Sequence, residues 1–152
     1  MIIIYKKILL AVDGSFHSNN AVKKAIEIQK FYNCRVIIIH SIKDNRVPSD
    51  LYPNVDVLYS KYSNLEDVYK DAGNTLLKYT KQKFGTAEKL VETRLIEKVA
   101  PEDYIFQIVE KESIDLVILG SRGQHSKIKK VFLGTVSTKV AKNVPCDVLL
   151  VK

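Results

Sequence analysis

The chain has 152 residues, of which 46% are apolar and 27% charged, with 24 lysines and arginines against 17 aspartates and glutamates. This length suits a single domain over residues 1–152 with one core, and the composition argues against a disordered chain. No run approaches the roughly 18 apolar residues that a membrane span needs, so we expect no membrane partner.

The N-terminal apolar run is interrupted by Lys6 and Lys7 and lacks the organisation of a targeting signal, so we expect a cytoplasmic protein. Cys34 and Cys146 are far apart in the sequence, and neither belongs to a C-x-x-C or Cys/His pair. This usage fits a reducing compartment. We therefore expect both cysteines to be structural, and a disulfide between them is not the favoured arrangement.

Short apolar runs alternate along the chain with segments of helical spacing. The expected strands are Lys6–Val12, Arg35–Ser41, Lys89–Ile96, Ile114–Leu119 and Asp147–Val151. The expected helices are Ser15–Tyr32, Asn64–Phe84, Glu102–Glu112 and Val136–Asn143. This alternation predicts an α/β fold with a parallel sheet, helices on both of its faces and right-handed crossovers. In such sheets ligands bind beyond the carboxyl ends of the strands, where the strand order reverses.

The segment Lys43–Ser63 contains Pro48 and Pro53 and shows no clear period, so we predict a long loop. Loops of this length are uncommon in a compact domain unless they have a function or are mobile. Two interpretations stay open: a surface excursion whose tyrosines pack on the fold, or a lid over the site.

A glycine-containing loop follows the strand Ile114–Leu119. Gly120 and Gly123 allow the backbone to approach a ligand closely, and Gly134 with Thr135 suits a helix start. Helix N-termini carry unpaired N–H donors and partial positive charge, so strand, loop and helix start predict a phosphate site. The prediction fails if Gly134 lies inside one longer helix, where glycine costs about 1 kcal/mol relative to alanine.

Positive charge is concentrated in the same part of the chain. From Gly120 onward there are seven lysines and arginines and one aspartate, which amounts to +6 of the net charge of +7. A positive cluster around a glycine loop attracts a polyphosphate, although a solvated basic helix face would have the same composition. Only Phe132 interleaves the charges, so the segment does not favour nucleic acid as a partner.

Several catalytic and nucleotide motifs are absent from the sequence. It contains neither the G-x-G-x-x-G fingerprint after the first strand nor a P-loop. The three histidines have no metal-ligand spacing, and Ser15 has no evident triad partner. We therefore expect no metal ligands and no catalytic residue in the chain, and at most slow hydrolysis of a bound polyphosphate.

Several segments together resemble the universal stress protein family over almost the whole chain. They are KKILLAVDGS (Lys6–Ser15), the strand Arg35–Ser41, LVILGSRG (Leu116–Gly123), FLGTV (Phe132–Val136) and VPCDVLLV (Val144–Val151). The resemblance implies one universal stress protein domain with a three-layer, doubly wound fold, Rossmann-like and of the adenine nucleotide alpha hydrolase type. Its five-stranded parallel sheet would have the order 3-2-1-4-5. A homodimer is implied too and, in one branch, ATP bound by the pattern G-x2-G-x9-G-(S/T).

The resemblance also assigns roles to residues of an adenine nucleotide site. Asp13 and Ser41 would lie near the nucleoside, while Gly120 and Gly123 would pass along the ribose and α-phosphate. The remaining members of the implied set are Ala11, Val12 and Leu119 on the nucleoside side, Arg122 in the glycine loop, and Gly134, Thr135 and Val136 at the phosphates. The ligand would be ATP or AMP, with any Mg²⁺ held through the phosphates.

Two features depart from the family's pattern. Ten residues separate Gly123 from Gly134 where the pattern has nine, and the extra residue falls within Gln124–Ser126, where the phosphates would run. Ala100 precedes Pro101 where family members commonly have glycine. The first departure keeps open a second function, a family member without nucleotide that acts as a protein-interaction module.

An enzyme of the wider adenine nucleotide group, releasing pyrophosphate or transferring a nucleotidyl group, is disfavoured. Such families carry a serine-glycine-rich or His-x-x-His loop after the first strand, and Asp13–Ser18 (DGSFHS) is neither.

The last apolar segment predicts an exposed sheet edge. Such edges are usually paired or covered in native proteins. We therefore predict that Val148–Val151 pairs with its copy across a two-fold axis, as the family resemblance also implies.

Overall fold

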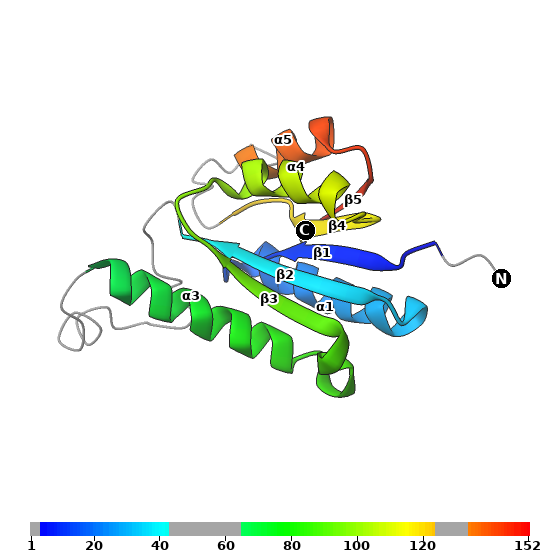
Figure 1. The fold of residues 1–152 in the computed structure, drawn as a ribbon, viewed down its shortest axis with the longest axis horizontal. Helices are drawn as coiled ribbons and strands as arrows, with labels where there is room; N and C mark the ends of the chain where they lie inside the picture. Colours follow the sequence, from blue (N-terminus) through cyan, green and yellow to red (C-terminus); the bar gives the residue numbers. More distant parts are fainter. Residues whose placement is uncertain (1–3, 43–64, 124–133) are drawn as a thin grey trace.

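The computed structural model describes residues 4–42, 65–123 and 134–152 (Figure 1). Its strands are β1 (Lys7–Ala11), β2 (Arg35–Ser41), β3 (Val91–Ile96), β4 (Leu116–Gly120) and β5 (Asp147–Val151). Its helices are α1 (Phe16–Tyr32), α3 (Leu65–Gln82), α4 (Pro101–Lys111) and α5 (Thr135–Asn143), with a short 3-10 helix η1 (Gly85–Leu90). The predicted loop Lys43–Ser63 lies outside the described residues, as does Gln124–Ser126.

All neighbouring strands pair in parallel, in the order β3-β2-β1-β4-β5. This confirms the expected order 3-2-1-4-5. The central strand β1 pairs on both sides, with Leu9 opposite Ile37 of β2 and Val117 of β4. The carboxyl ends of β1 and β4 therefore lie side by side at the middle of the sheet.

Both faces of the sheet are covered by helices, as Figure 1 shows: α1 and α3 on one face, α4 and α5 on the other. Successive strand residues point to opposite faces. Ile8 and Leu10 accordingly pack in the core under α1 and α3, whereas Leu9 packs in the core under α4 and α5. Because both faces are buried, the middle of each central strand is a continuous apolar run, such as residues 8–11 in β1 and 36–39 in β2, and does not alternate with polar residues.

The edge strand β3 begins later than predicted. Lys89 and Leu90 belong to η1, which follows α3 and begins with Gly85, a residue in the left-handed conformation (φ 59°). From Val91 the strand has an exposed Glu92 and three half-buried residues, so β3 is more exposed than β1, β2 and β4.

Helix starts follow local chemistry. In α1, the Ser15 hydroxyl caps the helix by accepting the N–H of Ser18. Before α4, Ala100 has an ordinary extended conformation (φ −63°, ψ 144°), so no glycine is needed there, and Pro101 occupies the first helical turn. Alanine therefore adopts the backbone conformation required at position 100 without strain.

Cys34 and Cys146 both carry free thiols, in agreement with the expectation that they are structural. Burial is the main cause that raises the pKa of each thiol. Within the described residues, no helix combines the length and apolar character that crossing a membrane would require.

Candidate functional site

The carboxyl ends of β1 and β4 bring Asp13 and Gly123 together. A Cβ placed on Gly123 would lie 3.0 Å from Oδ2 of Asp13. This separation is tighter than ordinary side-chain packing, so only glycine lets the loop backbone pass the carboxylate undisturbed. Asp13 and Gly123, which are 110 positions apart in the sequence, thus meet at the carboxyl ends of the strands, where the sequence predicts a ligand site.

Asp13 is held in place by the turn that starts α1. Its N–H donates to Oγ of Ser18 (3.0 Å), and its Oδ1 accepts the N–H of Ser15 (2.9 Å). Gly14 between them has a positive φ of 80°, which glycine adopts without strain. The turn therefore fixes the carboxylate through Oδ1 and directs Oδ2 toward the glycine loop.

The start of α5 lies beside the same loop. Gly134 is the N-cap residue in an extended conformation (φ −76°, ψ 171°), and the helix begins at Thr135. This confirms the predicted helix start. A Cβ on Gly134 would lie 3.5 Å from the backbone nitrogen of Gly123 and 3.5 Å from Cα of Arg122. The glycine loop and the helix start are thus in contact.

The N–H groups at this helix start divide into two kinds. Gly134 N–H donates to the carbonyl oxygen of Ser121 (2.7 Å) and is used by the fold. The N-cap residue, Gly134, has no side chain that could cap α5. The N–H groups of its first turn, Thr135–Ser137, have no acceptor within the helix, because that is the general property of a helix N-terminus. These are the donors that an anion could use.

Gly120 has a packing reason that sequence reasoning did not identify. A Cβ at this position would lie 2.8 Å from the carbonyl carbon of His17 and 2.8 Å from the nitrogen of Ser18. Both are backbone atoms of α1 and cannot rotate away. Gly120 therefore lets the end of β4 pack directly on the first turn of α1.

On the β2 side of the site, main-chain groups are already paired. Val12 N–H donates to the carbonyl of Ile39 (2.9 Å), and its own carbonyl accepts a hydrogen bond from Nδ1 of His40 (2.8 Å). Since a carbonyl only accepts, Nδ1 of His40 carries the proton. Burial lowers the pKa of His40, which is 5% exposed. The N–H of Val12 is therefore used by the sheet, and its carbonyl is held by His40.

Ser41 lies at the same edge of the sheet as Asp13, since each is two residues beyond the register pair Ala11 and Ile39. Its hydroxyl donates to the carbonyl of Val99 (2.8 Å). Among the other predicted residues, Leu119 is buried in the core on the α4 and α5 side of the sheet, and Ala11 and Val136 are partly buried against the same core. Thr135 is exposed.

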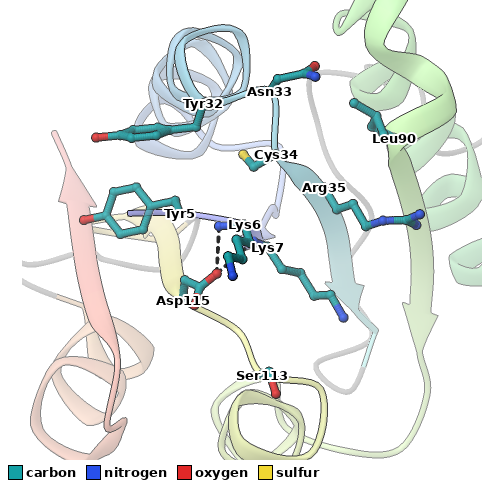
Figure 2. Close-up of a pocket in the computed structure, with 10 residues that line it drawn as sticks. All are labelled: Tyr5, Lys6, Lys7, Tyr32, Asn33, Cys34, Arg35, Leu90, Ser113 and Asp115. Atoms are coloured by element: carbon teal, nitrogen blue, oxygen red, sulfur yellow. Dashed lines mark hydrogen bonds between the residues drawn. The ribbon is translucent and has the colours of Figure 1, made fainter. Parts of the chain in front are cut away.

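The opposite end of the sheet carries a hollow of about 590 Å³ (Figure 2). Its lining residues are Tyr5, Lys6, Lys7, Tyr32, Asn33, Cys34, Arg35, Leu90, Ser113 and Asp115. Oδ2 of Asp115 accepts the N–H groups of Lys6 (2.8 Å) and Lys7 (3.0 Å), which joins the start of β1 to the segment before β4. None of the sequence-predicted site residues lines this hollow.

Sequence reasoning missed three polar residues that build the site: His17, His40 and Ser121. Ser121 lies between Gly120 and Gly123, and His40 directly precedes Ser41, and these three neighbours belong to the site that the sequence predicts. Their position next to predicted site residues could therefore have indicated Ser121 and His40. No comparable signal marked His17. In the three described ranges, no group of three or more His, Cys, Asp and Glu side chains could hold a metal ion.

Fold and site together define a doubly wound α/β protein with a glycine loop and a helix start with a glycine N-cap at the carboxyl ends of its central strands. In open parallel sheets this is the usual position of a ligand site. Residues 4–152 match the model of the universal stress protein family, and the chain belongs to this family. A universal stress protein of Methanocaldococcus jannaschii is 31% identical over 150 residues, covering 98% of this chain and 83% of that protein.

Solved structures share the fold. The universal stress protein UspA of Lactobacillus plantarum has a TM-score of 0.77 at 22% identity, covering 97% of this chain and 98% of its own. A universal stress protein in complex with cAMP has a TM-score of 0.57 at 27% identity, with 97% of both chains covered. A universal stress protein of Archaeoglobus fulgidus in complex with dAMP has a TM-score of 0.64 at 16% identity, covering 98% of this chain and 99% of its own.

Proposed function

We propose that this protein binds an adenine nucleotide, ATP or AMP, beyond the carboxyl ends of β1 and β4. It would act as a stress or signalling module in which occupancy, with little or no hydrolysis, is the signal. The observation that carries the proposal is the contact between three features: the Asp13 carboxylate, the Gly123 backbone and the start of α5 at its N-cap Gly134.

The nucleoside end of the ligand would lie at Asp13. Oδ2 can accept a hydrogen bond from a ribose hydroxyl or a base N–H group, because an ionised carboxylate is an acceptor only. Ala11, Val12, Ser41 and Leu119 would form the walls around the base. Since the N–H of Val12 is paired with β2, Val12 would contribute shape and no main-chain N–H donor to the base.

The phosphate end would lie along Gly120–Gly123 and at the start of α5. The first-turn N–H groups and the positive end of the helix dipole favour an anion there. The hydroxyl of Thr135 and the charge of Arg122 would add to this attraction, and Gly134 would allow close approach. Mg²⁺, where present, would be held mainly by phosphate oxygens, as is usual for this ion.

The known structures of relatives support the choice of an adenine nucleotide. One structural neighbour at 27% identity was solved with cAMP, and another member of the family with dAMP. Both ligands combine adenine with a single phosphate. This is the part of the ligand that Asp13 and the glycine loop would hold in our proposal.

We further propose that the protein is a cytoplasmic homodimer that pairs through β5. The residues Val148–Val151 are half-buried, and β5 has β4 as its neighbour on one side. Pairing with the same strand of a second copy would satisfy the outer edge of the described sheet.

The decisive experiment is an equilibrium titration with ATP and AMP, with and without Mg²⁺. Wild type is compared with Gly123→Val, whose side chain would enter the space next to Asp13. Thr86→Val serves as the matched control, because it introduces the same side chain, valine, at an exposed position in η1. We expect saturable binding to wild type and the control, and loss of binding in Gly123→Val.

Absence of binding to wild type would overturn the proposal. It would favour the second function, a nucleotide-free protein-interaction module. The observation behind that alternative is the spacing between Gly123 and Gly134, which is one residue longer than the pattern of the ATP-binding branch.

A further inference from the structure

Ser121 connects three elements around the proposed nucleotide site. Its N–H donates to the carbonyl of Val151 in β5 (2.7 Å), and its carbonyl accepts the N–H of Gly134 before α5 (2.7 Å). Its hydroxyl forms a hydrogen bond with Nδ1 of His17 in α1 (2.9 Å). Ser121 is 2% exposed, so it has little room to exchange these partners for water.

His17 holds the glycine loop at two neighbouring points. Its carbonyl carbon is one of the atoms that a Cβ on Gly120 would meet at 2.8 Å, so the end of β4 packs on its backbone. Its imidazole then reaches the next residue, Ser121, through Nδ1. The backbone contact sets how closely β4 approaches α1, whereas the side-chain bond sets where the loop goes after the strand ends.

Displacement of Ser121 would move the parts of the site that face the ligand. Gly123 lies two residues further along the loop, against Oδ2 of Asp13, and Gly134 is bonded to Ser121 itself. The proposed phosphate donors of α5 directly follow Gly134. A shift of His17 would therefore move Ser121, and with it the backbone at the nucleoside end and at the phosphate end of the proposed ligand.

We infer that His17 is a positioning residue of this site: its hydrogen bond to Ser121 holds the glycine loop at the separation from Asp13 and α5 that a nucleoside phosphate requires. This inference rests on the proposed nucleotide binding for its effect on affinity. His17 acts through Ser121 and needs no contact with the ligand.

The test compares four variants with wild type. His17→Leu removes the hydrogen bond and replaces the imidazole with an apolar side chain. His17→Asn is the matched control, because an Asn side chain places a polar atom on Cγ where histidine has Nδ1. Ser121→Ala removes the other partner, and the double variant His17→Leu/Ser121→Ala completes a thermodynamic cycle.

Two quantities are measured for each protein. The first is the dissociation constant for AMP by equilibrium titration. The second, without nucleotide, is the hydrogen exchange rate of the Gly134 amide, with the Val12 amide, bonded to Ile39, as internal reference. We expect His17→Leu and Ser121→Ala each to weaken AMP binding about fivefold, the change that loss of one ordinary hydrogen bond produces. The double variant should bind AMP at least as tightly as the single variant with the lower affinity.

Exchange of the Gly134 amide should become faster in His17→Leu and Ser121→Ala but not in His17→Asn. Unchanged exchange in His17→Leu would overturn the inference, even if AMP binding fell, because the loop would then not depend on His17. Multiplicative losses in the double variant would also overturn it.

The exchange measurement separates this inference from the proposed function. If wild type fails to bind AMP while Gly134 exchange responds as expected, nucleotide binding is wrong and the positioning of the loop by His17 stands. If wild type binds AMP and His17→Leu binds equally well with unchanged exchange, the positioning role is wrong and nucleotide binding stands.

Discussion

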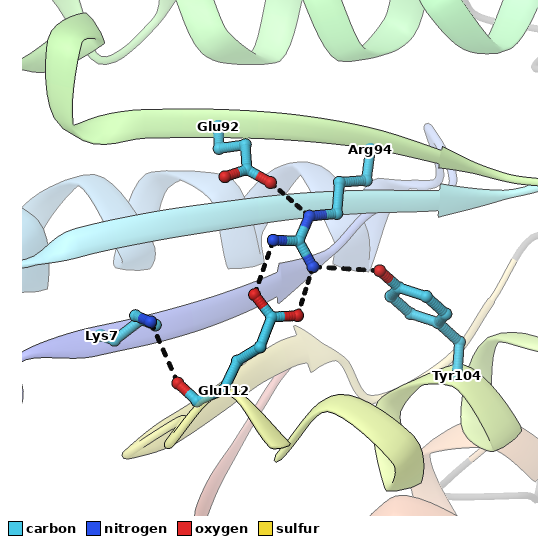
Figure 3. A network of polar contacts seen from close by, with 5 residues as sticks. All are labelled: Lys7, Glu92, Arg94, Tyr104 and Glu112. Carbon is cyan, nitrogen blue, oxygen red and sulfur yellow. Dashed lines mark hydrogen bonds and ion pairs between the residues drawn. The ribbon is translucent and has the colours of Figure 1, made fainter. Parts of the chain in front are cut away.

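The guanidinium of Arg94 on β3 binds the carboxylate of Glu112 at the end of α4 through two nitrogens, with NH2 2.7 Å from Oε1 (Figure 3). It also donates to the hydroxyl of Tyr104 (3.1 Å) and contacts Glu92. Both partners of the main pair are about one quarter exposed. This network ties the edge strand to the helix that covers it.

Arg94→Met should therefore destabilise the protein by roughly 1–2 kcal/mol, because it leaves a partly buried carboxylate without its charged partner. The free energy of unfolding in urea measures this. Lys24→Met is the matched control: its ion pair with Glu27 is exposed, with side-chain exposures of 48% and 68%, and should contribute little. Equal losses of unfolding free energy in Arg94→Met and Lys24→Met would contradict the stabilising role of the Arg94–Glu112 pair.

His40 should make stability dependent on pH below neutrality. Burial lowers its pKa in the folded state below the ordinary value of 6.5, so the unfolded chain binds the proton more readily. The contribution of the neutral, hydrogen-bonded imidazole is present above the unfolded pKa and is lost as pH falls through that value toward the lower, folded one. The free energy of unfolding should thus decrease on acidification from about pH 7.5 to about 5.5.

The matched variant for this prediction is His40→Gln, which keeps a donor but does not titrate. Its free energy of unfolding should depend less on pH over the same interval, although the variant is less stable at neutral pH. Parallel pH profiles for the two proteins would show that the buried imidazole does not supply the dependence.

Gly120 and Gly134 should respond differently to alanine. Gly120→Ala places a methyl group 2.8 Å from two backbone atoms of α1 and should cost roughly 1–3 kcal/mol. Gly134→Ala meets its nearest atoms at an ordinary 3.5 Å and keeps an accessible φ of −76°, so it should cost only the roughly 0.5–1 kcal/mol by which an N-cap position prefers glycine to alanine. Unfolding free energies in the reverse order would be inconsistent with the packing of β4 on α1.

The proposed dimer gives a measurable mass. If β5 pairs with its copy, sedimentation equilibrium at micromolar concentrations should give about twice the chain mass of 17.3 kDa. The mass should not change when Gly123→Val removes nucleotide binding, because Gly123 is not among the residues Val148–Val151 that pair in the proposed dimer. A mass near 17.3 kDa across the concentration series would exclude pairing through Val148–Val151.

Local patterns in the sequence were sufficient for the order of elements, the parallel sheet and the start of α5 at Thr135. These features depend on the spacing of apolar residues and on the conformational preference of single residues, such as Gly134 before a helix start. Such preferences act between residues close in the chain, so they can be read without coordinates. The boundary of β3 was less accurate, because η1 competes with the strand for Lys89 and Leu90.

Only the tertiary structure decided which side chains meet across the fold. The bonds of His17 with Ser121, His40 with Val12 and Arg94 with Glu112 join residues 104, 28 and 18 positions apart. Their formation depends on how closely helices and strands pack, which no local pattern encodes. The same holds for Gly120: the sequence marked the glycine, but the backbone of α1 at 2.8 Å supplies the reason that no larger residue fits.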